Sequence, residues 1–375
     1  MSRPNPIVRR HARVVVKVGS NLLTDKLAGV NLERIDSIAA GVSDIQSLGC
    51  QVAVVSSGAI GAGIAARRLK ERPKTMREKQ ATAAIGQPIL MEAYEAAFRN
   101  HSLMVGQILL TKDDFVNRER YLNSRNTLSV LFENDVIPII NENDTVAVEE
   151  IKLGDNDNLS AMVAHMIGAD LLVILSDIDG FYSDDPSRNR RAELIPLVET
   201  ITPRMERGAR KSGGELGTGG MLTKIQAAKR CTAAGIAVVI ANGSNPRVLQ
   251  EIVSGRFTGT LFLPAPGRVN VRKRWIGFVS HPRGSIRIDE GAKSALTNQG
   301  KSLLPSGVLE VTGVFNAQDT ISVLDMTGKE IARGVSGYSS AELGRIRGRR
   351  TDEVEKVLGR RAHGEVIHKD NLVLL

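Results

Sequence analysis

The segment from residue 141 to residue 158 reads NENDTVAVEEIKLGDNDN and holds six carboxylate and four carboxamide side chains, in a chain whose formal net charge is +9. A calcium loop of the EF-hand type would place its oxygen ligands at alternating positions and end on a glutamate, and neither NEND nor GDNDN fits that pattern. A solvated acidic loop would not need so many asparagines. The segment therefore indicates a site that holds some other ligand.

A second segment, KSGGELGTGGMLTK (211–224), has the features of a phosphate site. Thr218, Gly219 and Gly220 precede a predicted helix, so backbone N–H groups can converge on an anion at the positive end of that helix. Lys224 follows one helical turn after Gly220, on the same face, and could reach the same phosphates. A flexible glycine-rich loop that only caps the helix is the alternative. The threonine, the paired glycines and the correctly spaced lysine together favour phosphate binding.

The common nucleotide-binding motifs are missing. The P-loop pattern GxxxxGK[ST] does not occur, because Gly300-Lys301-Ser302 has an alanine at position 295 instead of the first glycine. The residues from Gly61 to Ala66 do match GxGxxA after a predicted strand, but the charged segment that follows supplies neither the second strand nor the acidic residue of a dinucleotide site. These glycines therefore indicate close packing between helices, and a dehydrogenase is disfavoured.

The elements that must position these residues form an α/β pattern. Short β-branched runs alternate with alanine-rich helical stretches such as 32–49, 119–134 and 221–235 over the first 262 residues. The predicted strands are 13–20, 51–58, 103–111, 135–141, 170–177 and 236–243. Their almost continuous apolar character predicts strands of a mainly parallel sheet, buried on both faces.

Ligands of open α/β sheets bind beyond the carboxyl ends of the strands. Five predicted strands end in small or polar residues, namely Lys17 to Ser20, Ser56 to Ala59, Asn141 to Asp144, Ser176 to Asp177 and Asn242 to Ser244. Lys17 itself lies within an apolar strand, where a lysine is costly unless it is paired or functional. These strand ends predict a site built from several loops.

The pattern changes after the turn-rich sequence PAPG near residue 265. Short strands separated by turns follow, and 319–337 predicts a hairpin around TGKE. We predict a first domain at 1–265, a linker at 266–282 and a small β-rich domain at 283–365. Residues 268–375 carry 18 Lys+Arg against 12 Asp+Glu, a net charge of +6, which is either ordinary solubility or a surface for an anionic partner.

Composition narrows the class of protein. Two distant cysteines, Cys50 and Cys231, argue against a disulfide framework, and no segment approaches the roughly 20 apolar residues of a membrane span. We therefore expect a cytoplasmic protein without a membrane partner.

Taken together, the motifs resemble the amino acid kinase family over almost the whole chain. VVKVGSNLLT (15–24), VSSGAIGAG (55–63), INENDTVAVEEIKLGDNDNLSA (140–161), LLVILSDIDGFYSDDP (171–186) and GTGGMLTK (217–224) match that family in order. Within it, the chain is most similar to the members that phosphorylate the γ-carboxylate of L-glutamate, the first step of proline biosynthesis. The tail, with DEGAKSALTNQGKSLLPSGV (289–308), resembles a PUA domain. The implied fold is an α/β three-layer sandwich with a mainly parallel sheet, followed by a small β-rich domain.

The resemblance implies roles for individual residues. Lys17 and Lys224 would act on the transferring phosphate and Asp157 would orient their ammonium groups, although Asp157 and Asn158 could also simply begin the following helix. Asp144 would bind the α-ammonium group of glutamate, while Ser57 and Asn156 would bind carboxylates. The implied ATP-binding residues are Lys17, Ser176, Asp177, Thr218, Gly219, Gly220, Met221, Leu222, Thr223 and Lys224. Mg²⁺ would be held by water and phosphate oxygens, so no protein metal ligand is expected.

The resemblance also implies partners. Proline would be a feedback inhibitor that overlaps the glutamate site, the chain would form a homodimer or homotetramer, and a reductase would follow it. Two alternatives stay open. One is another amino acid kinase, such as an acetylglutamate, aspartate or UMP kinase, against which the tail and the INEND and GDNDN motifs argue. The other is an RNA-binding protein that acts through its basic tail.

Overall fold

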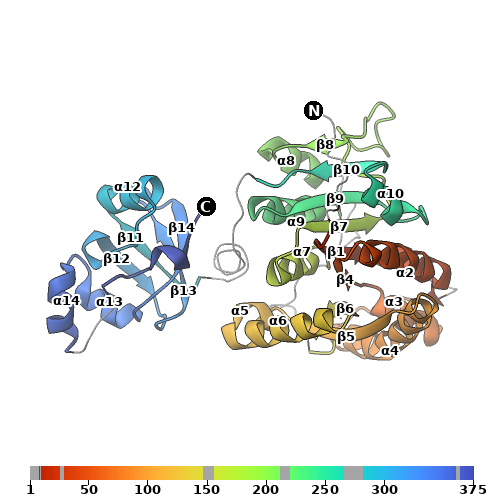
Figure 1. The fold of residues 1–375 in the computed structure, drawn as a ribbon, viewed down its shortest axis with the longest axis horizontal. Helices are drawn as coiled ribbons and strands as arrows, with labels where there is room; N and C mark the ends of the chain where they lie inside the picture. The colour runs from red at the N-terminus through yellow and green to blue at the C-terminus, as the bar shows by residue number, and fades with distance from the viewer. Residues whose placement is uncertain are drawn as a thin grey trace. The chain divides into compact units, whose positions relative to one another are not determined.

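The computed structural model describes residues 8, 10–25, 29–146, 156–211, 220–265, 282–359 and 364–375. The chain divides into two compact units, Met1–Arg268 and Val269–Leu375 (Figure 1). The predicted linker at 266–282 falls, apart from Pro282, outside the described residues. No helix in the described ranges is long and apolar enough to cross a membrane.

The first unit is built on one large sheet with the strand order β5-β6-β4-β1-β7-β9-β10-β8. Its strands are β1 (Arg13–Val18), β4 (Gln51–Val55), β5 (Met104–Leu110), β6 (Val136–Glu142), β7 (Leu171–Ser176), β8 (Leu197–Val198), β9 (Ala237–Asn242) and β10 (Gly259–Phe262). Neighbouring strands are parallel except β9 and β10, which pair antiparallel. The mainly parallel sheet and all six strands predicted from the sequence are therefore confirmed.

The burial of β5 differs from the prediction. β7 is buried along its whole length, as expected for a strand covered on both faces, but most of β5 is at least partly accessible and Met104 is 69% exposed. The reason is its position, because β5 is an edge strand with β6 as its neighbour on one side. Apolar composition alone does not separate an edge strand from a central one.

Helices cover both faces of this sheet, which makes the three layers expected of the fold class. Figure 1 shows α2, α3, α4 and α10 on one face and α6, α7 and α9 on the other. The helices of the first unit are α1 (Ser20–Leu23), α2 (Leu32–Ser47), α3 (Ala59–Ala66), α4 (Met76–Asn100), α5 (Asp113–Val116), α6 (Arg118–Glu133), α7 (Asn156–Ile167), α8 (Pro203–Lys211), α9 (Met221–Ala233) and α10 (Val248–Ser254). Two short strands, β2 (Thr24–Asp25) and β3 (Gly29–Val30), form a separate antiparallel pair.

Helices α3 and α4 pack backbone against backbone at two glycines. A Cβ atom on Gly63 would lie 2.0 Å from the carbonyl oxygen of Thr82, and one on Gly86 would lie 1.9 Å from that of Ala59. Neither position has room for any side chain. The glycines after β4 thus allow close helix packing, as the sequence predicted. This contact also fixes α4 beside the loop that follows β4.

The second unit has a five-stranded sheet with the order β12-β11-β13-β14-β15. The elements are β11 (Gly284–Ile288), α12 (Glu290–Gln299), β12 (Val308–Gly313), β13 (Thr320–Leu324), β14 (Glu330–Val335), α13 (Ser340–Ile346), α14 (Thr351–Leu358) and β15 (Leu372–Leu374), with short 3₁₀ turns at Pro305–Gly307 and Lys369–Asn371. The predicted hairpin is confirmed, since β13 and β14 pair antiparallel. Phe315, Tyr338 and aliphatic side chains fill a separate core under this sheet.

Candidate active site

A cavity of about 2840 Å³ lies at the carboxyl ends of β1, β4, β6 and β7 in the first unit. The predicted residues that line it are Lys17, Ser57, Asp144, Asn156, Ser176, Asp177, Gly220, Met221 and Lys224. This volume is well above the roughly 300–1,000 Å³ of a pocket for one small ligand, so two substrates could share it. The fifth predicted strand end does not take part, because Asn242 instead donates to Asp179 Oδ1 at 2.9 Å.

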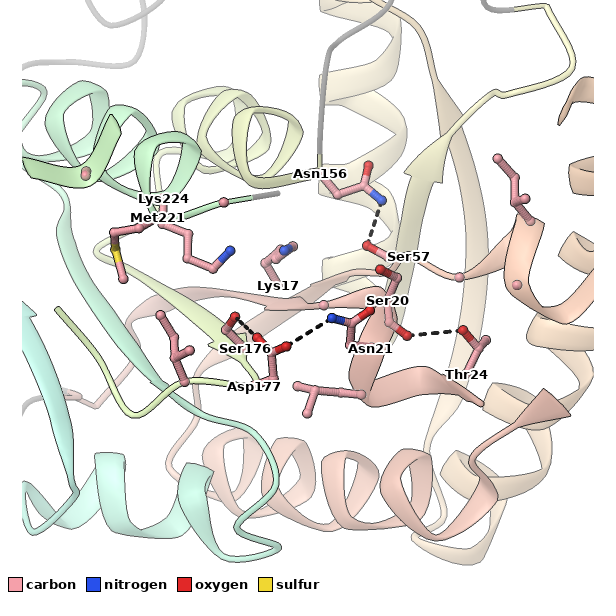
Figure 2. A pocket seen from close by; sticks show the side chains of 18 of the residues that line it. Lys17, Ser20, Asn21, Thr24, Ser57, Asn156, Ser176, Asp177, Met221 and Lys224 are labelled. Carbon is pink, nitrogen blue, oxygen red and sulfur yellow. Dashed lines mark hydrogen bonds between the residues drawn. The ribbon is translucent and has the colours of Figure 1, made fainter. Parts of the chain in front are cut away.

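Two lysines from distant elements converge on one buried carboxylate. Asp157, in the first turn of α7, forms two ion pairs. One is with Lys17 Nζ of β1 at 2.5 Å and the other is with Lys224 Nζ of α9 at 3.3 Å. The side chains of both lysines are almost fully buried, and that of Asp157 is 0% exposed. In Figure 2 the ammonium groups of Lys17 and Lys224 point toward the same part of the cavity. The cluster carries a net charge of +1 and is suited to bind an anion.

The surroundings of Asp157 keep it ionised. Burial alone would raise the pKa of Asp157, but Lys17, Lys224 and the Thr223 hydroxyl together outweigh burial and hold the pKa below its ordinary value. The carboxylate is therefore a permanent countercharge near neutral pH. Its two oxygens each pair with one ammonium group, and the resemblance implied that this residue orients the two lysines.

The first turn of α9 holds Thr223 and Lys224 in place. Gly220 is the N-cap of this helix, and Thr223 Oγ1 lies 2.8 Å from the carbonyl oxygen of Gly220 and 2.7 Å from Asp157 Oδ2, so its single proton is shared between the two acceptors. Thr223 thus contacts the carboxylate and, like Leu222, does not line the cavity as the predicted ATP-binding role implied. Two further predicted residues, Thr218 and Gly219, lie outside the described residues.

A second cluster joins the ends of β4 and β6 to the start of α7. Asn156 Nδ2 lies 2.8 Å from both the carbonyl oxygen of Ser56 and Ser57 Oγ, and 3.2 Å from Asn141 Oδ1, so its two N–H groups are shared among three acceptors. Figure 2 shows the bond between Asn156 and Ser57 at the edge of the cavity. Because Ser57 Oγ accepts this bond, its own proton stays available for a carboxylate.

In this structure the N–H groups of Asn156 are already engaged by the protein. An amide that binds a ligand carboxylate must donate an N–H, but both N–H groups of Asn156 already have protein acceptors. The atom that remains for a ligand is Oδ1, which accepts and therefore suits an ammonium group. Asp144 lines the same cavity and also suits a cation. The cluster thus offers a hydroxyl donor from Ser57 and acceptors from two other residues.

A third group lies after β7. Ser176 Oγ donates to Asp177 Oδ1 at 3.1 Å, and Asn21 Nδ2 of α1 donates to Asp177 Oδ2 at 3.0 Å (Figure 2). Burial would raise the pKa of Asp177, but these two hydrogen bonds, with a smaller effect of Lys224, lower it overall. Both predicted residues, Ser176 and Asp177, therefore face the cavity as an ordered pair.

Sequence reasoning missed Asn21, and it gave Asn141 no role of its own. Both are asparagines at strand ends, and that position in the sequence was the signal that could have marked them. Lys152, which the family motif also includes, lies outside the described residues.

Residues 12–242 match the family model described as the amino acid kinase family, and residues 284–358 match the PUA domain model. The chain is 49% identical over 369 residues to the glutamate 5-kinase of Geobacter sp. (strain M21), which covers 98% of this chain and 99% of that protein. It is 48% identical over 363 residues to the glutamate 5-kinase of Thermoanaerobacter sp. (strain X514), and this alignment covers 97% of this chain and 98% of that protein.

Solved structures of more distant proteins also match. The isopentenyl phosphate kinase product complex of T. acidophilum has a TM-score of 0.46 and 21% identity, and covers 66% of this chain and 99% of that chain. The UMP kinase of Bacillus anthracis has a TM-score of 0.47 and 16% identity, and covers 68% of this chain and 97% of that chain.

Proposed function

The chain belongs to the amino acid kinase family, and we propose that it transfers the γ-phosphoryl group of ATP to the γ-carboxylate of L-glutamate, which forms L-glutamyl 5-phosphate and ADP. The relatives named above, at 48–49% identity over almost the whole chain, support this substrate. The observation that carries the chemistry is the pair of ammonium groups held by Asp157 next to a cluster suited to an amino acid.

The nucleophile needs no general base. The γ-carboxyl group of glutamate has an ordinary pKa of about 4.3, so it is already ionised near neutral pH. One carboxylate oxygen forms the new P–O bond while the bond from the γ-phosphorus to the β–γ bridging oxygen breaks, and that oxygen leaves with ADP. Catalysis then depends on alignment and on the neutralisation of charge on the transferring phosphoryl group.

The two lysines would supply this neutralisation. The ammonium groups of Lys17 and Lys224 pair with the same carboxylate. A phosphoryl group that contacts both ammonium groups would therefore lie close to Asp157. Asp157 keeps the two ammonium groups oriented without touching the substrate. Thr223 would add to this by fixing one carboxylate oxygen. These roles make Lys17 and Lys224 the catalytic residues and Asp157 their positioning residue.

Mg²⁺ would enter with the nucleotide. The oxygens of Asp157 and Asp177 already accept bonds from lysine, hydroxyl or amide groups. No group of three or more His, Cys, Asp or Glu side chains in the described ranges could hold a metal ion. These residues fit a magnesium ion held mainly by phosphate oxygens and water. Such an ion would neutralise charge on the β- and γ-phosphates.

The rest of ATP would contact the α9 end of the cavity. The N-terminus of α9 presents backbone N–H groups after Gly220, and helix N-termini favour phosphate. Met221, Ser176 and Asp177 line the cavity beside it. By family resemblance Thr218, Gly219, Leu222 and Thr223 would complete the nucleotide site.

Glutamate would bind at the other end. Asp144 and Asn156 Oδ1 would accept from its α-ammonium group, and Ser57 Oγ would donate to a carboxylate. Proline carries a secondary ammonium group and the same α-carboxylate group, so we propose that it inhibits by overlapping this site. Millimolar proline should then lower the rate at subsaturating glutamate. Unchanged rates would exclude that form of regulation.

Two further properties follow from the proposed chemistry and from the resemblance. An acyl phosphate hydrolyses readily, so we propose that a reductase consumes the product soon after release. We also propose a homo-oligomer of two or four chains in the cytoplasm, which light scattering of the purified protein would test. A mass equal to one chain would refute the oligomer.

The function is tested by ATP turnover with and without L-glutamate, with the acyl phosphate trapped as its hydroxamate. Aspartate, N-acetylglutamate and UMP serve as controls for other activities of the family. Hydroxamate formed only with glutamate is the expected result. Turnover with a control substrate alone would assign a different kinase, and no turnover with any of them would direct attention to the basic second unit and RNA.

A further inference from the structure

Gln87 of α4 lies next to the cluster of Ser57, Asn141 and Asn156, through its contact with Asn141, and does not line the cavity itself. Its side chain is only 9% exposed, and its Oε1 accepts from Asn141 Nδ2 at 2.9 Å. Asn141 in turn contacts Asn156, so a continuous chain of hydrogen bonds runs from α4 through β6 to α7. Gln87 Nε2 is buried and finds no acceptor among the described residues. A buried glutamine whose NH2 group has no acceptor costs free energy of folding. Such a residue is therefore expected to serve a function through its oxygen.

Backbone atoms at both ends determine the direction of this chain. The carbonyl oxygen of Ser56 can only accept, so Nδ2 of Asn156 must face it. The N–H of Glu142 can only donate and bonds Asn141 Oδ1 at 2.9 Å, so Nδ2 of Asn141 must point the other way. That nitrogen requires an acceptor, and Gln87 Oε1 provides it. The orientation of each amide therefore follows from hydrogen-bond geometry.

The position of Gln87 is fixed by its neighbour. Gly86 packs against the backbone of Ala59 in the first turn of α3, which begins two residues after Ser57. Helix α4 therefore cannot slide relative to the loop that carries Ser57. The helix also starts on a capping box between Thr75 and Glu78, which ties down its first turn.

We propose that Gln87 is a positioning residue that sets substrate specificity at the amino-acid site. By accepting from Asn141 Nδ2, it holds the Asn141 side chain in place, so that Asn141 Oδ1 stays beside Asn156 Nδ2. This supports the orientation of Asn156 that the carbonyl oxygen of Ser56 sets, with Oδ1 as the atom left for a ligand. The site then presents an acceptor, and it selects a substrate with a free ammonium group. This inference rests on the proposed function, because it concerns the glutamate subsite.

The test compares Gln87→Met with Gln87→Glu. Methionine has a similar length and no strong acceptor, so the Nδ2 group of Asn141 loses its acceptor and the Asn141 side chain can shift away from Asn156. We expect the KM for L-glutamate to rise about tenfold, which corresponds to about 1.4 kcal/mol, while kcat and the KM for ATP change less than about threefold. Gln87→Glu retains an acceptor oxygen in either protonation state, so its KM should stay within about threefold of wild type.

Inhibition by glutarate, which has both carboxylates of glutamate but no ammonium group, supplies a readout that general loosening of the site would not reproduce. In Gln87→Met the inhibition constant of glutarate should change less than about threefold while the KM for glutamate rises. Leu90→Ala, a fully buried apolar position one helical turn further along α4, is the matched control. It should lower Tm and leave the KM for glutamate near the wild-type value.

The outcomes separate two failures. A wild-type protein without glutamate-dependent hydroxamate formation would overturn the proposed function. An active wild type together with a Gln87→Met variant of unchanged KM would overturn only the role of Gln87. Equal losses of affinity for glutamate and glutarate, or an equal rise of KM in Leu90→Ala, would also overturn it, because either result means that the packing of α4 and not its hydrogen bond matters.

Discussion

Replacement of Asp157 by asparagine tests the central feature of the site, because it removes one negative charge and changes the side-chain volume very little. In the wild-type protein this carboxylate pairs with Lys17 Nζ at 2.5 Å and with Lys224 Nζ at 3.3 Å, and its side chain is 0% exposed. Asparagine would place an N–H group against at least one ammonium group or against the Thr223 hydroxyl. The variant therefore keeps two buried positive charges and loses their countercharge.

The size of the effect follows from burial. Removal of one partner from a buried ion pair costs about 3–5 kcal/mol of stability. For a unit of this size each kcal/mol lowers Tm by roughly 2–4 °C, so we expect a decrease of about 6–20 °C in the unfolding of the first unit. Loss of a single group that stabilises transition-state charge lowers kcat by about 10²–10³. Because Asp157 orients two such groups, we expect a loss near the upper end of that range.

The response to ATP distinguishes this explanation from simple damage to the fold. The phosphates of ATP supply negative charge where the variant lacks it, so the Kd for ATP in Asp157→Asn should equal or fall below the wild-type value. ATP at 100 times its Kd should restore about 2.7 kcal/mol of stability. The variant would then bind ATP well and transfer its phosphoryl group poorly.

Hydroxamate formation gives kcat, titration calorimetry gives the Kd for ATP, and thermal unfolding with and without ATP gives the stability. Asp44→Asn is the matched control, since it makes the same chemical change at an exposed position of α2, and it should change neither kcat nor Tm appreciably. Near-wild-type turnover in Asp157→Asn would refute the assigned role. An ATP affinity weakened tenfold or more would also refute it, because it would show that the lysines are no longer available to the phosphates.

Three further predictions follow. Lys224→Met should lower kcat by at least about 10²-fold and leave the KM for glutamate within about threefold, as steady-state kinetics would measure, and a change confined to the KM for glutamate would contradict its place on the phosphate. Asp144→Asn should mainly raise the KM for glutamate, by about tenfold or more if it holds the α-ammonium group, and an unchanged KM would contradict that contact. The pKa of Asp157 lies below its ordinary value of 3.8 in the folded protein, so its contribution to stability is fully present above that pH and is lost as pH falls through the folded pKa. Denaturant unfolding should therefore show a stability difference between wild type and Asp157→Asn that is constant from pH 7 to about pH 5 and narrows below about pH 4, and a constant difference down to acid would contradict the ion pairs.

Much of the sheet could be predicted because its strands are almost continuous runs of apolar residues, many of them β-branched. β7, for example, is LLVILS and is buried throughout. Such runs satisfy both faces of a parallel strand, and the residues that follow them necessarily meet at one edge. Lys17 could be recognised for a related reason, since a lysine within an apolar strand needs a partner. The partner itself, Asp157, was found through the family motif and lies 140 residues away in the sequence.

The roles of Gln87 and Asn21 could not be predicted in this way. Gln87 contacts Asn141 across 54 residues, and Asn21 contacts Asp177 across 156 residues, in both cases through the packing of a helix against a strand end. Nothing in the sequence near Gln87 marks it as different from other polar residues of a helix, and Asn21 is marked only by its place just after a strand. The same holds for β5, whose position at the edge of the sheet depends on strand order.

The orientation of an asparagine side chain, that is, which way its oxygen and its nitrogen point, cannot be read from the sequence. In the asparagine-rich segment this orientation decides which ligand groups Asn156 can bind. An aspartate at position 156 would place a carboxylate oxygen against the carbonyl oxygen of Ser56, where Nδ2 of Asn156 now donates at 2.8 Å. It would also take the proton of Ser57, which at present accepts from the amide and keeps its hydrogen for a ligand. Two acceptors would then face each other and a donor would be lost to the substrate. The asparagine is therefore required first by the backbone around it, and the acceptor oxygen that it leaves for a ligand is a consequence of that requirement.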